Sequence, residues 1–550
     1  MLRRLPAEKF IGLFYSSPGM GWSGTRGRLL AVGGTAFAGL LARSGRAFGS
    51  LRLLGGLQVG NGGRPFAGDR ATLTTVGPSR PTARLHFTLL KRARVTMEAL
   101  ATGQGVRSEL PLAGTQADVA ERMVTLGAGE HVLNWTPPTQ STARTYILKV
   151  TARSGVRTES ATAVARLLGI DAAFGARSAL PGDTVPLVVS SDAQQLTLQL
   201  LRSGPEAVPT YADNLINGVP VGDPITIDWS RNTNAPAPIP VEIGVDWPSG
   251  VYAAQLQSPD GRIGFAPLVV RTVNPTSRIA VVMPTSTWGA YNFYDADGDG
   301  WGDTWYARWK TDLVDLTRPH SARGVPYRYR SYDLAFQQWL AQTGTVVDQY
   351  ADEDLDLFAS PTDLRAAYDL IVFPGHTEYV TSRTYTLVEA YRDLGGNLLF
   401  MSANNFFRRV GRHEHTLNLV DEWRNLGRPE AALCGVQYIA SDRGQRRAPF
   451  LVLGEDYAPW AFAGTGLHNG STFGIYGIEI DARAPETPSN TFVLASIPDL
   501  FGPGRTAEMT YYEHWSGARV FSAGVLDFGG KILLWRGARK LFENVWARLA

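Results

Sequence analysis

The chain has 550 residues, of which 44% are hydrophobic, and this length predicts about three globular domains. The formal net charge of +3 is small, and no dense run of lysine or arginine occurs, which argues against nucleic acid as the main partner. The single cysteine, Cys434, excludes an intrachain disulfide and any metal site built from several cysteines.

Residues 1–80 are predicted to form a leader and a linker. Within them, Leu29 to Ala42 is an apolar stretch of 14 residues, which is short for a membrane span but suits the apolar part of a secretory signal. Arg43 and Arg46 follow it closely, which instead fits a poorly ordered Gly/Arg-rich leader. Export and a cytoplasmic location both remain open. No other segment approaches the length of a membrane span, so no integral membrane span is expected.

Residues 81–168 are predicted to form a first β-sandwich. Alternating apolar and polar residues in RLHFTLL, RVTMEAL, ERMVTL, GEHVLNW and TYILKVTARS indicate five short strands. The segments GEHVLNW and TYILKVTA resemble the Ig-like domains of exported bacterial proteins. Residues 169–276 carry further strand patterns, among them PLVVSS, LTLQLL, PITIDW and GVYAAQL, and predict a second β-sandwich that Asn274-Pro275 ends.

From residue 277 to 550 the pattern changes to strands that alternate with helices. The strands are expected in RIAVVMP, TVVDQY, DLIVFPG and GNLLFMSANN, and helices in residues 332–343, in LDLFASPTDLRAAY and in SRTYTLVEAYRDLGG. This alternation predicts an α/β domain with a doubly wound parallel sheet.

Polar residues follow three of these strands. Because parallel strands bring their carboxyl ends to one edge of a sheet, the three loops should meet there. Aromatic and asparagine side chains also often do no more than close a loop, and this alternative stays open. The residues concerned are Thr287, Trp288, Tyr291 and Asn292 after the first strand, His376, Glu378 and Tyr379 after the third, and Asn404 and Asn405 after the fourth.

The usual hydrolytic nucleophiles are missing from these loops. Cys434 lies in AALCGV rather than in a strand-to-helix elbow, no G-x-S-x-G motif occurs, and no glycine-rich phosphate loop is followed by its lysine. A metal-activated water is therefore the more natural route to hydrolysis.

Several motifs occur in the order found in one enzyme family. PTSTWGAYN, GHTEYVT, GGNLLFMSANNFF, YGIEID and MTYYEHWSGARVFSAG resemble segments of the large (beta) subunit of N,N-dimethylformamidase and its relatives, over roughly residues 170 to 530. The resemblance implies a C-terminal domain similar to a glutamine amidotransferase sheet without its cysteine. It also implies an amidohydrolase that cleaves a small or substituted amide, with a small subunit or a homo-oligomer as the expected assembly.

The resemblance further implies a mononuclear iron held by two tyrosinates and one carboxylate. Carried over by motif, the ligands here would be Tyr252 of SGVYAAQL, Tyr291 of WGAYN and Glu378 of GHTEY, with His376 as a proton carrier and Asn404 orienting substrate or water. Such hard anionic oxygen donors favour ferric iron over softer metals. Tyr252 belongs to the preceding β domain, so its alternative role is a strand tyrosine that fills the seam between domains.

One insert departs from the family pattern. After AYN the chain continues into FYDADGDGWGDTWYARWK, which changes a wall of the expected pocket. Its spacing D-x-D-x-D-G-x-x-D resembles the front half of a calcium loop, although Tyr306 stands where an EF-hand requires glutamate. A calcium site and a solvated acidic turn are the alternatives. The residues are Asp295, Asp297, Asp299 and Asp303.

Two functions of different class follow. The first is an iron-dependent amidohydrolase, which the trio Tyr252, Tyr291 and Glu378 favours. The second is an exported, calcium-stabilised surface protein that binds on the same scaffold without turnover, which the Ig-like segment and the acidic insert favour.

Overall fold

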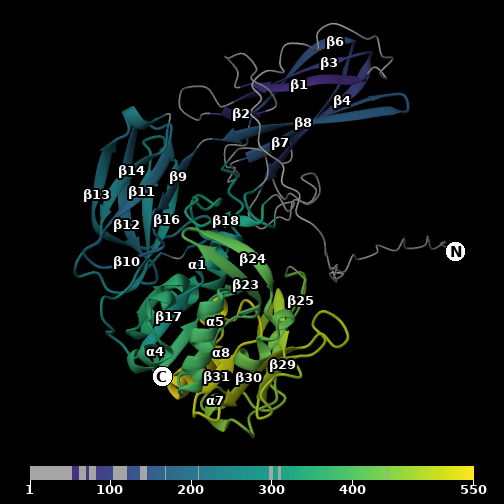
Figure 1. Cartoon of the computed structure of the whole chain (residues 1–550). Helices are drawn as coiled ribbons and strands as arrows, with labels where there is room; N and C mark the ends of the chain where they lie inside the picture. The colour runs from purple at the N-terminus through teal and green to yellow at the C-terminus, as the bar shows by residue number, and fades with distance from the viewer. Residues whose placement is uncertain are drawn as a thin grey trace, which may run out of the picture. The chain divides into compact units, whose positions relative to one another are not determined.

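The computed structural model describes residues 52–60, 70–73, 82–102, 120–136, 145–167, 169–208, 210–233, 235–296, 302–306, 311–442 and 444–550. The predicted leader up to residue 51, including the apolar stretch from Leu29 to Ala42, lies outside the described residues. The described part consists mostly of β-sheets with few helices (Figure 1). None of its helices is long and apolar enough to cross a bilayer.

The first two sheets share a core in which alternate strand residues are buried, among them Leu85, Phe87, Val95 and Tyr146. Residues Leu54–Gly60 (β1) pair antiparallel with residues Ala83–Leu89 (β3), so part of the stretch predicted as linker belongs to a sheet instead. The three-stranded sheet contains β1 (Leu54–Gly60), β3 (Ala83–Leu89) and β6 (Gly129–Trp135), and the five-stranded sheet contains β2 (Arg70–Leu73), β8 (Arg157–Leu167), β7 (Thr145–Ser154), β4 (Ala93–Thr102) and β5 (Ala120–Leu126).

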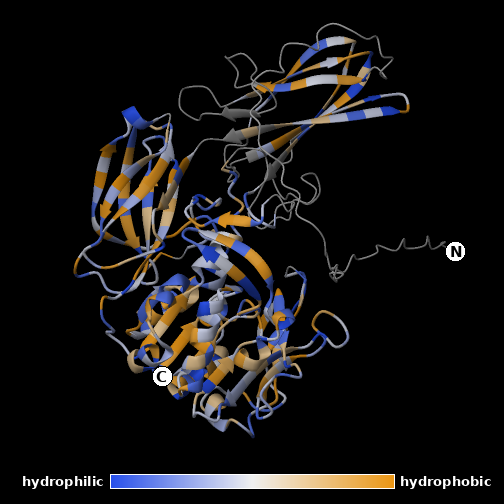
Figure 2. Ribbon diagram, viewed as in Figure 1, coloured by the Kyte–Doolittle hydropathy of each residue, from blue (hydrophilic) through white to orange (hydrophobic). Residues whose placement is uncertain are grey.

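The next two sheets enclose a second core, which includes Leu187, Leu196, Tyr252 and Leu256. Figure 2 shows the alternation of apolar and polar residues along these strands, which places one face of each sheet in the core. The sheets are β10 (Ser178–Ala179), β16 (Ile263–Val270), β15 (Gly250–Gln257), β12 (Gln195–Arg202) and β13 (Val219–Asp228), and β14 (Ala237–Glu242), β11 (Thr184–Ser191) and β9 (Ile170–Phe174). The Ig-like character of either unit and the predicted domain boundaries remain predictions.

A nine-stranded sheet forms the centre of the C-terminal region. Its first five strands are parallel, as the alternation of strands and helices predicts, whereas its last four are antiparallel, which the sequence did not reveal. The likeness to an amidotransferase stays a prediction. The order is β19 (Asp348–Ala351), β17 (Ile279–Met283), β20 (Leu370–Phe373), β22 (Asn397–Phe400), β31 (Arg519–Ser522), β30 (Ala507–Glu513), β29 (Phe492–Ile497), β26 (Arg447–Val452) and β27 (Thr472–Gly477).

Helices cover both faces of the parallel strands. On one face α4 (Pro361–Ala367) and α5 (Ser382–Asp393) share a core with Ile371 and Phe400. Helix α5 begins where the Thr381 hydroxyl accepts a hydrogen bond from the backbone N–H of Thr384, at 3.1 Å. The opposite face carries α3 (Leu334–Thr343) and α8 (Arg536–Leu549).

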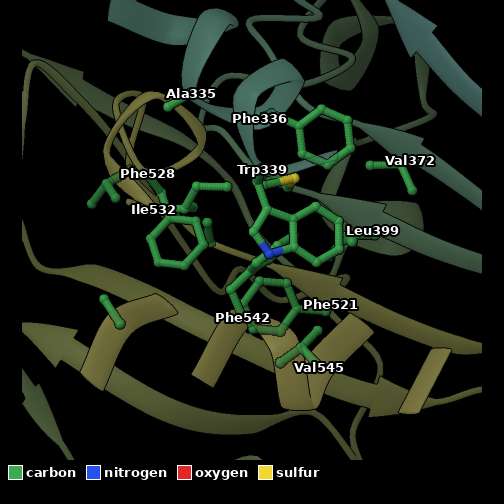
Figure 3. Close-up of a cluster of buried hydrophobic side chains, with 14 of the residues drawn as sticks. Ala335, Phe336, Trp339, Val372, Leu399, Phe521, Phe528, Ile532, Phe542 and Val545 are labelled. Atoms are coloured by element: carbon green, nitrogen blue, oxygen red, sulfur yellow. The ribbon is translucent and has the colours of Figure 1, made fainter. Parts of the chain in front are cut away.

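Trp339 of α3 lies at the centre of the core on this opposite face of the sheet (Figure 3). Its ring lies 4.7 Å from that of Phe542 and 4.8 Å from that of Trp546, both on α8, with edge-to-face geometry. Val372 and Leu399 of the parallel strands belong to the same core. These contacts bury large aromatic surfaces and so fix the strands whose ends carry the candidate site.

Two small sheets and several short helices complete this region. One sheet joins β18 (Leu313–Asp315), β24 (Thr416–Glu422), β23 (Arg408–His413) and β21 (Tyr379–Val380), and the other pairs β25 (Gln437–Ser441) with β28 (Glu479–Ala482). The remaining helices are α1 (Thr285–Ala290), α2 (Tyr329–Tyr332), α6 (Ala431–Cys434) and α7 (Pro459–Phe462), and the 3₁₀ turns are η1 (Ser230–Asn232), η2 (Asp352–Leu357), η3 (Trp423–Leu426) and η4 (Gly529–Lys531).

Candidate active site

The loops after β17, β20 and β22 meet at one edge of the parallel sheet, as predicted. Short helix α1 follows β17 and ends at Tyr291. In the loop after β20, the backbone at Gly375 packs directly against the Asp333 side chain. A Cβ at this position would lie 2.0 Å from the Asp333 carboxylate, so only glycine fits. Further along this loop, the backbone N–H of Glu378 donates to the Thr287 hydroxyl at 3.2 Å, which ties the loop to α1.

The centre of the cluster is the buried carboxylate of Glu378. Tyr291 donates its hydroxyl to Glu378 Oε2 at 2.7 Å. Tyr306 lies 3.3 and 3.4 Å from the two carboxylate oxygens and forms a hydrogen bond with the hydroxyl of Tyr379. The rings of Tyr291 and Tyr306 stack at 4.5 Å. Three phenols and one carboxylate therefore converge within a single buried space.

Burial shifts the protonation of all these groups in the same direction. It raises the pKa of Tyr291, Tyr306 and Tyr379 well above the usual value for tyrosine, with the Glu378 charge adding to the effect. Burial also raises the pKa of Glu378. Burial thus keeps protons on the three phenols and opposes the negative charge on Glu378, and a positive charge placed among these oxygens would act in the opposite direction.

His376 lies beside the carboxylate. Its Nε2 is 3.4 Å from Glu378 Oε2 and 3.5 Å from Glu479 Oε2, and the Asn404 side-chain amide lies 3.3 Å from the same nitrogen. Burial lowers the pKa of His376 to about 3, so the imidazole is neutral near pH 7. The ring therefore accepts a proton only when a developing charge nearby favours it.

Asn404 is held by a second carboxylate. Its backbone has a positive φ of 59°, and its N–H donates to both oxygens of Asp481, at 2.8 and 3.0 Å. Its Nδ2 then donates to Glu479 at 2.9 Å. Asn404 thus connects Glu479 to the ring of His376. By contrast, the amide of Asn405 donates to the Ser402 carbonyl at 2.9 Å.

Two residues of this cluster were missed by the sequence analysis. Tyr306 belongs to the insert, where it was noted only for its place in the calcium spacing. Glu479 lies in the quoted segment YGIEID, at the start of β28, but no role was given to it. An acidic residue in a motif shared with a hydrolase family was the available signal.

Tyr252 does not join the cluster. Its hydroxyl donates to the Pro248 carbonyl at 2.9 Å, and its ring stacks on Trp247 at 5.0 Å. Burial raises its pKa to about 12. It packs in the core of the second pair of sheets. The prediction that Tyr252 shares a centre with Tyr291 and Glu378 is thus corrected, because both faces of β15 are buried and its side chain fills the sandwich.

The predicted calcium site falls partly outside the described residues, because Asp297 and Asp299 are not among them. Asp295 is buried, and the Asp303 carboxylate accepts a hydrogen bond from the backbone N–H of Ala296 at 2.7 Å. Calcium therefore stays a prediction. Across the described ranges, no group of three or more His, Cys, Asp or Glu residues is arranged so that it could hold a metal ion.

A cavity of about 530 Å³ opens onto the cluster. Its lining includes Tyr291, Tyr306, Tyr327, Arg328, His376 and Glu479. A larger cavity of about 750 Å³ lies beside Trp247, Gly250 and Gln337 and touches neither Glu378 nor His376. The smaller cavity is the one with chemistry in its wall, and its size falls within the roughly 300–1,000 Å³ of typical ligand pockets.

Residues 221–536, more than half of the chain, match the family model described as N,N-dimethylformamidase beta subunit-like, C-terminal. The chain belongs to this family. All residues of the cluster lie within the matched range. The sequence resemblance to the dimethylformamidase beta subunit is therefore confirmed at the level of the family.

Individual relatives are more distant. The N,N-dimethylformamidase beta subunit of Paracoccus aminophilus is 27% identical over 182 residues, which are 33% of this chain and 23% of that protein. Among solved structures, Salmonella alpha-2-macroglobulin reacted with methylamine matches 40% of this chain and 16% of its own, with 10% identity and a TM-score of 0.22. Escherichia coli alpha-2-macroglobulin activated by porcine elastase matches 42% of this chain and 23% of its own, with 12% identity and a TM-score of 0.21. At these TM-scores the likeness supports no argument.

Proposed function

We propose that this chain is an iron-dependent amidohydrolase, with the metal held by Tyr291, Tyr306 and Glu378. The observation that carries the proposal is the convergence of two phenol oxygens on one buried carboxylate, at 2.7 to 3.4 Å. Membership of the dimethylformamidase-like family supports a hydrolase that acts on linear amides. In this proposal Tyr306 takes the place first given to Tyr252.

The donor set fits a ferric ion. Phenolate and carboxylate oxygens are hard anionic ligands, and three of them balance the charge of a trivalent cation. Without a cation, burial keeps protons on the phenols, as the raised pKa values of Tyr291 and Tyr306 indicate. A bound cation would replace those protons, so metal binding should release protons and strengthen as pH rises.

The remaining residues supply proton transfer and orientation. A bound ferric ion would polarise an amide carbonyl and acidify water. Neutral His376 accepts a proton from the attacking water and passes it to the leaving amine. Glu479, 3.5 Å from His376 Nε2, stabilises the imidazolium while it exists. Asn404 keeps Glu479 in place through its hydrogen bond of 2.9 Å.

Metal content and colour test this proposal. The purified protein should contain about one iron per chain and absorb visible light, because tyrosinate bound to ferric iron gives a charge-transfer band, and it should hydrolyse an amide. Tyr306→Phe should weaken iron binding by at least about 10- to 100-fold. Tyr252→Phe is the matched control and should keep both iron and colour, since the Tyr252 hydroxyl donates to the Pro248 carbonyl and lies outside the cluster.

The opposite pattern would contradict the assignment. If Tyr252→Phe lost iron and Tyr306→Phe retained it, the ligands would instead be Tyr252, Tyr291 and Glu378. A protein that binds no iron and hydrolyses no amide would leave a binding role on the same scaffold.

A further inference from the structure

Arg328 stands out among the residues of the catalytic cavity. It lines the same cavity as His376 and Glu479, and its guanidinium carbon lies 5.7 Å from the centre of the Tyr327 ring. Its backbone is left-handed, with φ of 54° and ψ of 24°, a conformation that costs a residue other than glycine. Strained positions of this kind concentrate where a side chain must be aimed for function.

The charge of Arg328 is not balanced by a carboxylate within ion-pair distance in the described part of the chain. The other charged groups of the cavity each have partners. Asp442 accepts from the backbone N–H groups of Gly444 and Arg446, at 2.9 and 2.7 Å. Glu479 accepts from Asn404. Arg447 lies 3.7 Å from Asp527.

The Asp213 carboxylate acts on the charge of Arg328 only from beyond ion-pair distance, and it forms a salt bridge of 2.8 Å with Arg330. Arg328 is half-buried and lines the cavity, and no carboxylate of the described residues lies within ion-pair distance of it, so its guanidinium is suited to bind an anion from solution. Its planar fork matches the two oxygens of a carboxylate.

An aromatic wall connects this guanidinium to the candidate iron centre. The ring of Tyr327 is almost parallel to that of Tyr291, at 6° and 5.2 Å, and Tyr291 stacks in turn on Tyr306. Arg328 therefore lies at the Tyr327 end of one continuous stack, whose other two rings are the proposed ligands Tyr291 and Tyr306. A flat apolar spacer would pack along this stack and span from one end to the other.

We propose that Arg328 binds a carboxylate of the substrate, so that this chain cleaves an amide that carries a carboxylate across an aromatic or apolar spacer. The inference rests on the proposed function, since it assigns the amide bond to the centre at Glu378. It makes Arg328 a specificity-determining residue. The acyl carbonyl would lie at the tyrosine cluster and the carboxylate at the guanidinium.

Two substrates that differ only in the charged group test the proposal. We expect the iron-loaded protein to hydrolyse 4-acetamidobenzoate with a kcat/KM at least about tenfold above that of acetanilide, because charge-assisted, bidentate pairs are the strong ones. Arg328→Met should remove this preference by raising KM for 4-acetamidobenzoate about 10- to 100-fold, while acetanilide changes less than about twofold. Arg328→Lys should lie between the two, because lysine lacks the fork.

Arg330→Met is the matched control. Arg330 lies two residues away, on α2, but its guanidinium pairs with Asp213 and does not line the cavity. This variant should keep the preference for 4-acetamidobenzoate. Equal losses for both substrates in Arg328→Met, or no preference in the unmodified protein, would overturn the proposal.

A binding measurement separates this proposal from the proposed function. Calorimetry with 4-methylbenzoate and 4-methylbenzyl alcohol compares a carboxylate with a neutral analogue without turnover. Tighter binding of the carboxylate that Arg328→Met abolishes supports the anchor even if no amide is hydrolysed, in which case only the enzymatic proposal fails. Carboxylate binding that Arg328→Met leaves unchanged places the anion elsewhere, including on the metal, and refutes the anchor.

Discussion

Glu378→Gln should change the stability of the protein in opposite directions with and without metal. Glu378 is almost fully buried, with 3% of its surface exposed, and its best hydrogen bond comes from Tyr291 at 2.7 Å. The bonds from Tyr306 are long, at 3.3 and 3.4 Å. Burial raises the pKa of Glu378 despite these donors, which means that the hydrogen bonds do not offset the cost of burying the charge.

The size of the effect follows from these contacts. Glutamine has the same shape and its carbonyl still accepts from Tyr291, so the variant loses only the charge-assisted part of that bond, about 1–1.5 kcal/mol. It avoids the desolvation of a carboxylate, which costs several kcal/mol. In the metal-free protein at pH 8 we therefore expect a gain of about 1–3 kcal/mol, or roughly 2–4 °C in Tm for each kcal/mol.

Bound ferric iron should make the unmodified protein more stable than Glu378→Gln. The unmodified protein should gain about 2.7 kcal/mol when free iron is about 100 times Kd, whereas Glu378→Gln should gain little because the central ligand is lost. Thermal melts with chelator and with ferric citrate measure both effects. Glu389→Gln is the control, since Glu389 is 33% exposed in its pair with Arg428 and should change either melt only slightly.

A Glu378→Gln protein that is less stable than the parent in chelator, yet still stabilised by iron, would refute this reasoning. That result would mean that the carboxylate is structural and that the metal, if bound, lies elsewhere.

Two further variants test the site and its surroundings. His376→Ala should keep iron and colour yet lower kcat by roughly a hundredfold or more, because it removes the proposed proton carrier and none of the proposed ligands. Loss of iron in this variant would mean that His376 is itself a ligand. Asp333→Asn tests how the free energy of unfolding depends on pH. Burial raises the pKa of Asp333 to about 8 in the folded protein. The stability that its protonated form contributes is therefore complete below about pH 4 and is lost as pH rises through 8. Relative to the parent, the variant should therefore gain up to about 1.4 kcal/mol per pH unit between these limits, measured by denaturant unfolding, and parallel pH curves would show that Asp333 is not buried as an acid.

The sequence predicted best where the chain is most regular. Apolar runs such as Ile371 to Phe373, followed by Pro-Gly, indicated buried parallel strands, and the strand-end loops brought Tyr291, His376, Glu378 and Asn404 together as expected. The antiparallel half of the sheet was missed because the sequence of a short strand does not show which other strand it pairs with. Register and direction depend on contacts between residues far apart in the chain.

The structure differs from the predicted cluster at two tyrosines, Tyr252 and Tyr306, for different physical reasons. Tyr252 lies on β15, where residues on both faces are buried, so alternation could not show that its side chain points into the sandwich. Tyr306 lies in an insert without helical or strand periodicity, and no pattern there predicts which side chain turns toward Glu378. Only the folded chain shows that Tyr306, and not Tyr252, lies beside Glu378.

The segment from Tyr291 to Tyr332 has an unusual share of the proposed chemistry. It supplies the two proposed tyrosine ligands, the aromatic wall at Tyr327 and the proposed anchor Arg328. The groups proposed for proton transfer, His376 and Glu479, come from other loops that are fixed to the sheet. Loops at the carboxyl ends of strands vary more freely than the scaffold that holds them. A change in this one segment can therefore alter the proposed metal ligands and the proposed anchor together while the groups proposed for proton transfer stay in place, which is why the insert and the pocket should be tested as one unit.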